Sequence, residues 1–204
     1  MAQFALPLNV GGEDAARIIV GPSNQRVVDA LGRPESWPFR TAILVGPPRS
    51  GKSLLARWFT AQALGEAVDD ADSTAEDALF HRWNRAQAEG TALLLVSGRA
   101  PGDWRIALPD LASRLGAALL LEIGPPDDAM LRELIAEHAA RRGLALGEGA
   151  AAWLLPRIER SYAAAEAVVV EIDRLSLERK CPVTISLLRD ALSPAGTERQ
   201  PRLL

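Results

Sequence analysis

The feature that most constrains the fold is the stretch "GPPRSGKS", Gly46 to Ser53, which has the spacing G-x-x-x-x-G-K-S. It follows the apolar run "AILV" and precedes the amphipathic run "SLLARWF". A glycine-rich turn between a buried strand and a helix lets backbone amides surround phosphates at the positive end of the helix. The lysine supplies a charge for the β- and γ-phosphates, and the serine hydroxyl a ligand for Mg²⁺. The stretch therefore predicts a nucleotide site, and the alternative is a strand-to-helix turn that has lost its ligand.

The apolar runs indicate an α/β chain with a helical region after it. "RTAILVG", "TALLLVSG" and residues 118–123 are continuous apolar stretches separated by helical patterns. This alternation is typical of a parallel sheet whose strands are buried on both faces. After Pro125 and Pro126, three helical patterns follow without a buried strand. We therefore predict a tail at 1–9, an α/β base at 10–124, a helical lid at 125–192 and a disordered polar tail at 193–204.

Two carboxylates lie where a second part of the nucleotide site is expected. "AVDD" offers Asp69 and Asp70. We expect Asp69 to hold Mg²⁺ together with Ser53, and Asp70 to orient an attacking water. The alternative is a solvated acidic loop, because Ala67 and Val68 make a poor strand.

Composition excludes several classes of protein. The chain of 204 residues has a formal net charge of -3, which argues against a broad nucleic-acid surface. No apolar run approaches the roughly 20 residues that a membrane span needs. The single cysteine, Cys181, fits a cytoplasmic protein. His81 and His138 lie in helical patterns without metal-ligand partners, and we interpret both as structural.

The order and spacing of several stretches resemble the AAA+ ATPases of the DnaA superfamily, and most closely the Hda-type regulators of replication initiation. The matching stretches are "IIVGPSNQRVVDAL", "GPPRSGKSLLARWF", "VDD", "FHRWNRAQAEG", "LLVSGRAP", "LPDLASRL" and "IDRLSLERK…VTISLLRDAL". The resemblance implies a P-loop AAA+ parallel-sheet base with a small helical lid. The chain between Lys52 and Asp69 is short for this family, so we expect one strand fewer than usual.

The resemblance also implies roles for individual residues. The stretch containing Val20 would lie near the adenine, and Ser97 or Gly98 would be sensor 1. Arg114 would be an arginine finger, which acts on the nucleotide of a neighbouring subunit; the alternative is a surface arginine. The residues implied for ADP or ATP are Val20, Gly46, Arg49, Ser50, Gly51, Lys52, Ser53, Leu54 and Asp69. Ala163 stands where the family has its sensor 2 arginine, and Arg160 lies one turn earlier. Hydrolysis by the chain itself is therefore expected to be weak or absent.

The N-terminal "QFALPL" resembles the short peptide with which replication proteins bind the bacterial β sliding clamp. Gln3 would supply amide hydrogen bonds, and the apolar anchors would be Phe4, Leu6 and Leu8. Pro7 would keep the segment extended, which lowers the entropy lost on docking. The alternative is an N-terminal strand that pairs with the protein's own sheet.

These features lead to one principal hypothesis and two alternatives. The principal hypothesis is a regulator that uses nucleotide, Mg²⁺ and the clamp to promote ATP hydrolysis by DnaA through Arg114, which inactivates DnaA. The first alternative is a clamp-bound recruiter or loader that does not stimulate hydrolysis. The second is a small P-loop kinase, which is disfavoured because the lid is poor in arginine. Self-association is left open, and neither a membrane nor a specific DNA sequence is expected as a partner.

Overall fold

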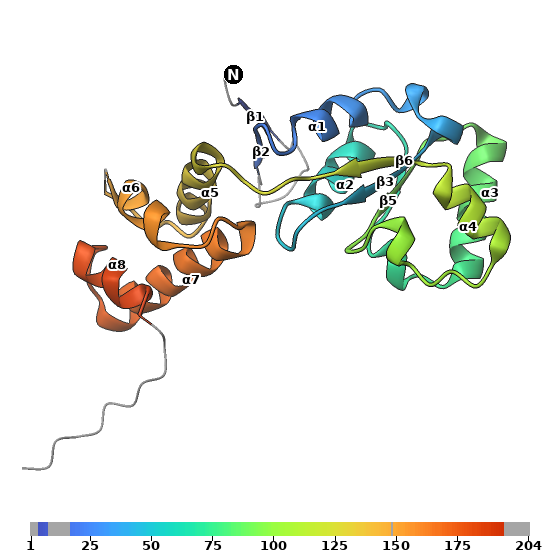
Figure 1. The fold of residues 1–204 in the computed structure, drawn as a ribbon. Helices are drawn as coiled ribbons and strands as arrows, with labels where there is room; N and C mark the ends of the chain where they lie inside the picture. The colour runs from blue at the N-terminus through green and yellow to red at the C-terminus, as the bar shows by residue number, and fades with distance from the viewer. Residues whose placement is uncertain (1–3, 8–16, 148, 194–204) are drawn as a thin grey trace, which may run out of the picture. The chain divides into compact units, whose positions relative to one another are not determined.

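The computed structural model describes residues 4–7, 17–147 and 149–193 and is drawn in Figure 1. It divides into two units, Met1–Met130 and Leu131–Leu204. The division falls inside helix α5 (Asp128–Arg141), shortly after the prolines at which the sequence changes character. The first unit is α/β and the second is helical.

A parallel sheet lies at the centre of the first unit. Its strands are β3 (Thr41–Val45), β4 (Glu66–Val68), β5 (Leu93–Val96) and β6 (Leu119–Glu122), in the spatial order β4-β5-β3-β6. The predicted parallel sheet is confirmed, and its four strands agree with the expectation of a shortened sheet. The prediction that residues 67–68 are too few for a strand was wrong. They extend from Glu66 as a short edge strand because β5 provides the hydrogen-bonding partner.

Helices cover both faces of this sheet. Helices α3 (Glu76–Glu89) and α4 (Pro109–Gly116) pack on one face through an apolar cluster that includes Ile43, Leu95 and Leu111. Neighbouring strand residues point to the opposite face. That face is covered by α1 (Gln25–Leu31) and α2 (Lys52–Ala61). Short 3₁₀ segments lie at residues 34–36, 38–40, 71–73 and 101–103.

The N-terminal segment forms a strand where an unpaired tail was expected. β1 (Phe4–Pro7) pairs antiparallel with β2 (Arg17–Val20), and Phe4 lies opposite Val20. This two-stranded sheet is separate from the four-stranded one. The physical reason is that an extended segment can satisfy its backbone groups on the edge of β2. The predicted clamp-binding residues Gln3 and Leu8 lie outside the described residues.

The second unit is a small helical bundle built mainly from α5, α6 (Ala150–Leu154), α7 (Tyr162–Arg179) and α8 (Ile185–Ala191). A 3₁₀ segment at residues 155–157 follows α6. One apolar cluster joins the four helices. Its buried members are Leu131, Ile135, Ala139, Ala150, Leu154, Ala165, Val168, Val169, Ile172, Leu175, Leu187 and Leu188. Ser161 and Thr184 cap α7 and α8 through their side-chain oxygens. Across the described ranges, no helix is long and apolar enough to cross a membrane.

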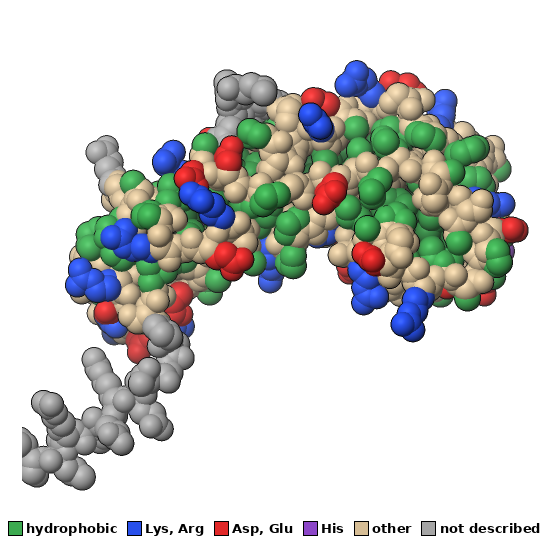
Figure 2. Space-filling model, viewed as in Figure 1, with side chains coloured by type: hydrophobic (Ala, Val, Ile, Leu, Met, Phe, Trp, Pro, Cys, Tyr) green, Lys and Arg blue, Asp and Glu red, His purple; other side chains and the backbone are tan. Residues whose placement is uncertain are grey.

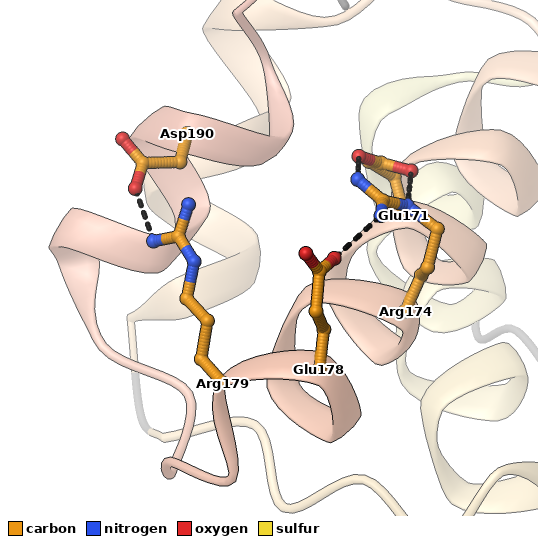
Figure 3. Close-up of polar contacts among 5 residues, drawn as sticks. All are labelled: Glu171, Arg174, Glu178, Arg179 and Asp190. Carbon is orange, nitrogen blue, oxygen red and sulfur yellow. Dashed lines mark hydrogen bonds and ion pairs between the residues drawn. The ribbon is translucent and has the colours of Figure 1, made fainter.

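Ion pairs form between residues on the surface of α7, and one joins α7 to α8. Figure 3 shows Arg174 between Glu171 and Glu178, with nitrogen–oxygen distances of 2.7 Å on each side. Arg179, in the last turn of α7, is paired with Asp190 of α8. The hydrogen bond from Arg174 lowers the pKa of the Glu171 carboxyl. Because such exposed pairs each contribute little, the bundle depends mainly on its apolar core.

Candidate functional site

The predicted phosphate loop connects β3 to α2 in the structure. A Cβ atom on Gly46 would lie 2.8 Å from the Ile123 Cβ, so the first glycine allows β6 to approach the start of the loop. Gly51 has a φ of 87°, a left-handed conformation that favours glycine, and its Cβ would meet no atom beyond its neighbours in the chain within 4 Å. Arg49 also has a positive φ, of 64°. The two glycines therefore have different roles: close packing for Gly46 and backbone direction for Gly51.

The loop offers hydrogen-bond donors to an anion. The Lys52 ammonium donates to the carbonyl oxygens of Gly46 at 2.8 Å and Pro47 at 3.0 Å, so it lies across the loop. The Ser50 hydroxyl is buried, and within the described residues it has no hydrogen-bond partner. In the same part of the chain, the amides of residues 51–54 at the start of α2 have no backbone acceptor. An orphaned hydroxyl, free amides and a nearby ammonium fit the phosphates of a nucleotide.

The other predicted loop residues lie around these donors. Ser53 is exposed in the first turn of α2, and Leu54 beside it is half-buried. The Ser53 hydroxyl is therefore accessible to a metal ion bound with the phosphates.

Three carboxylates act on the charge of Lys52. Burial lowers the pKa of Lys52, while Asp69, Asp70 and then Asp72 oppose this shift. Asp69 and Asp70 directly follow β4, and both are exposed. The carboxyl ends of parallel strands lie at one edge of a sheet, which explains why residues after β4 influence a lysine after β3. The structure thus brings the predicted acidic pair and the phosphate loop to the same edge.

Asp72 was not singled out from the sequence, although it is the third acid of the run "VDDADS". Its carboxylate lies 3.8 Å from the Arg99 Nε, which belongs to the segment after β5. Asp72 and Arg99 also line a pocket of about 230 Å³, together with Trp104 and Arg105. The repeated acids were the only sequence signal for this position.

Ser97, the predicted sensor 1, is engaged in its own loop. The side chain is buried, and its hydroxyl donates to the Arg99 carbonyl at 2.7 Å. It accepts from the Arg99 amide at 2.9 Å and from the Trp104 indole at 3.0 Å. The hydroxyl therefore holds the turn after β5 in place.

The stretch predicted to lie near the adenine contains a hydrogen-bonded turn between β2 and α1. Val20 is completely buried at the end of β2. The buried Asn24 side chain accepts from the Gly21 amide at 2.9 Å and donates to the Ile19 carbonyl at 2.8 Å. The Asn24 side chain, directly before α1, thus fixes this turn and makes no capping hydrogen bond to the helix.

Arg114 lies on α4 and contacts α3. Its Nη1 group donates to the Asn84 Oδ1 at 2.6 Å. Its guanidinium carbon lies 4.4 Å from the centroid of the Phe80 ring and 4.2 Å from that of Trp83. The structure therefore orients the planar group by two cation–π contacts and one hydrogen bond. Arg114 is not part of the cluster formed by the phosphate loop and the acids.

The loop that leads into α4 is also held by α3. The Glu76 carboxylate accepts hydrogen bonds from the amides of Ala107 and Leu108, at distances of 2.9–3.0 Å. A single glutamate gives no sequence signal for such a role, because its partners are backbone amides distant in the chain. Glu76 thus helps to fix the start of the helix that carries Arg114.

The position at which the family has its sensor 2 arginine lies in the second unit. Ala163 lies in the first turn of α7 and is exposed. Its methyl side chain supplies no charge to a phosphate.

The chain is similar to a known protein family over residues 127–192 and to solved structures over most of its length. Residues 127–192 match the family model described as "Hda, lid domain". Domain III of the Thermotoga maritima replication initiation protein DnaA is similar in structure, with a TM-score of 0.71 and 16% identity over 87% of this chain and 95% of that one. AMPPCP-bound DnaA from Aquifex aeolicus has a TM-score of 0.59 and 20% identity, over 80% of this chain and 66% of that one.

The Holliday junction branch migration motor RuvB of Thermotoga maritima also matches, with a TM-score of 0.59 and 17% identity over 85% of this chain and 69% of that one. At these identities the solved structures establish the fold, and the lid model adds the relationship at residues 127–192. Residues 127–192 thus match the Hda lid domain, and the chain as a whole has the fold of DnaA domain III.

Proposed function

We propose that the chain is a bacterial regulator of replication initiation that promotes ATP hydrolysis by DnaA. In this proposal the chain, carrying nucleotide and bound to the β sliding clamp, presents Arg114 to the ATP of DnaA. The observation that carries it is the orientation of the Arg114 guanidinium by Phe80, Trp83 and Asn84. A guanidinium already held in one orientation loses less entropy when it binds a phosphate. Arginine fingers increase phosphoryl-transfer rates by about 10³–10⁵ in well-studied systems.

The chain's own nucleotide site would serve to hold ADP or ATP. The amides of residues 51–54, the Ser50 hydroxyl and Lys52 would bind phosphates, and Ser53 with Asp69 would hold Mg²⁺. The phosphates of a bound nucleotide would accept hydrogen bonds from these loop donors. Because Ala163 offers no cation, we expect hydrolysis of this nucleotide to be very slow, with Asp70 as the residue that would orient water.

Clamp binding would use residues Gln3 to Leu8. The pairing of Phe4–Pro7 with β2 supports this use in one respect, since the segment is already extended. Docking on the clamp would exchange backbone partners from β2 to the clamp, so the free energy of the β1–β2 pairing would be subtracted from that of docking. Replacement of Gln3, Leu6 and Leu8 by alanine is expected to cut clamp binding sharply while leaving nucleotide binding unchanged.

The decisive experiment measures hydrolysis of DnaA-bound ATP on DNA-loaded clamp, with and without this protein. We expect stimulation by the wild-type chain, loss of stimulation for Arg114→Ala, and loss for the triple alanine variant at limiting protein concentration. Arg105→Ala is a matched control, because this exposed arginine lies on the segment just before α4. No stimulation by the wild-type chain would exclude the proposal.

A second function is favoured by one observation. The hydrogen bond from Arg114 to Asn84 occupies part of the guanidinium within the chain itself. A clamp-bound recruiter of DnaA would need Arg114 only for this internal contact. In that case the chain would bring DnaA to the clamp, and hydrolysis would be equal with wild-type and Arg114→Ala.

A further inference from the structure

The loop before β3 exposes an aromatic side chain. Phe39 is 59% exposed, and among the large exposed apolar side chains of the described ranges it is the only aromatic one. A phenylalanine at this exposure gains little from the protein's own core. Its position therefore calls for another explanation.

The backbone at this loop adopts an unfavourable conformation. Phe39 has φ 50° and ψ 25°, and Arg40 has φ 47°, so two successive residues with side chains are left-handed. This region is unfavourable for residues other than glycine, and such strain gathers at functional positions. The strained loop is thus a candidate for function and not a simple connection.

The end of α3 maintains the strained loop. The Gln87 side chain donates to the Phe39 carbonyl at 2.6 Å, and the Arg40 Nη1 donates to the Gly90 carbonyl at 2.7 Å. The Thr41 hydroxyl also donates to the Phe39 carbonyl, at 3.0 Å. These three bonds tie the two strained residues to the end of α3 and to the first residue of β3, and so hold the loop in the conformation that exposes the phenyl ring.

The Phe39 ring lies beside the Trp83 indole, which the Arg114 guanidinium also contacts. Its centroid is 6.5 Å from that of Trp83, and the Arg114 guanidinium carbon is 4.2 Å from the same Trp83 ring. The Trp83 indole nitrogen is buried and has no hydrogen-bond partner in the described part of the chain. Figure 2 shows apolar side chains gathered on the surface over β6, α4 and α3. A surface of aromatic residues and arginine is typical of the centre of a protein interface.

We propose that Phe39 is a docking anchor for the nucleotide-bearing subunit that receives Arg114. The inference rests on the proposed function of Arg114. The partner presents phosphate and carboxylate charge to the arginine and an apolar recess to the phenyl ring. Because both side chains lie against one indole, docking of the ring determines the angle at which the arginine approaches the nucleotide. The partner is thus an AAA+ subunit such as DnaA, with an apolar recess beside its nucleotide.

The test uses Phe39→Gly, since glycine adopts this φ without strain. We expect unchanged or higher thermal stability and about tenfold or more protein needed for half-maximal stimulation of DnaA hydrolysis. At saturating protein, the maximal rate is expected to equal that of wild type. Phe39→Asn, a residue that also tolerates left-handed backbone, should repeat the result, and Phe39→Tyr should restore docking. Leu177→Ala is the matched control, because Leu177 is 71% exposed on the lid.

The outcomes separate this inference from the proposed function. If Phe39→Gly and Phe39→Asn behave as wild type while Arg114→Ala is inactive, the docking inference is wrong and the arginine finger stands. A marked loss of thermal stability in both variants would assign the ring to the protein's own core and also overturn the inference. If the wild-type chain binds immobilised DnaA·ATP without stimulating it, weaker binding of Phe39→Gly supports docking although the finger fails. If the wild-type chain neither binds nor stimulates DnaA, both proposals are wrong.

Discussion

Replacement of Arg114 by alanine is expected to affect the stability of the base as well as the stimulation of DnaA. The change removes the 2.6 Å hydrogen bond to Asn84 and the contacts with the rings of Phe80 and Trp83. A hydrogen bond to a charged group contributes about 1.5–3 kcal/mol, and a cation–π contact at an exposed site about 0.5–1 kcal/mol. Since one half-buried side chain makes all three contacts, their effects do not add, and we expect a loss of about 2 kcal/mol.

Urea unfolding followed by tryptophan fluorescence measures this loss. With a denaturant dependence of about 1–3 kcal/mol per molar urea, a change of about 2 kcal/mol lowers the midpoint by roughly 1 M. Stimulation of DnaA must then be assayed where more than about nine-tenths of the variant is folded, which the same curve determines. Arg114→Lys is the matched control: it keeps the charge but lacks the planar fork, so we expect intermediate stability and little stimulation.

Two results would refute this reasoning. If Arg114→Ala unfolds at the same urea concentration as wild type, the contacts with α3 contribute nothing in solution. If the variant loses stability but stimulates DnaA normally when folded, Arg114 has only a structural role, and the recruiter hypothesis is favoured.

Three further results are expected. Mg²⁺-ADP at a hundredfold excess over its Kd should stabilise the wild-type base by about 2.7 kcal/mol in thermal unfolding, and Lys52→Ala should reduce this shift; an unchanged melting temperature with saturating nucleotide would contradict the phosphate site. Gly65→Ala should lower the free energy of unfolding in urea by about 1–3 kcal/mol, because the added Cβ would lie 2.3 Å from the Ala92 carbonyl oxygen. Gly116→Ala is the control: its added Cβ would meet nothing within 4 Å, so the change should be neutral or stabilising. Burial lowers the pKa of His138, so the unfolded state takes up its proton first. The melting temperature should therefore fall as the pH drops below the ordinary value of 6.5 and level off below the folded-state pKa, and His138→Gln should show a smaller fall between about pH 7 and pH 5.5. Equal pH profiles for wild type and variant would contradict this assignment.

The parallel sheet, the phosphate loop and the change to a helical region after Pro126 could all be predicted from consecutive residues. Continuous apolar runs indicate burial on both faces, so "TAILV" and "LLLV" were predicted as inner strands, and both lie inside the sheet. The glycine-lysine-serine spacing required a particular turn between a strand and a helix, which the structure contains. These are local properties, since backbone conformation and periodic burial can be read from consecutive residues.

The contacts between side chains that are distant in the sequence depend on the tertiary structure. Asp72 faces Arg99, and Glu76 binds the amides of Ala107 and Leu108, although nothing in their local sequence indicates these partners. The pairing of Phe4–Pro7 with β2 was likewise not determined by its apolar pattern, which suits either a strand or a docking peptide. Local sequence determines the conformation a segment can adopt, but its partner depends on which surfaces the folded chain brings within reach. The orientation of Arg114 has the same origin, because α3 and α4 come together only when both cover one face of the sheet.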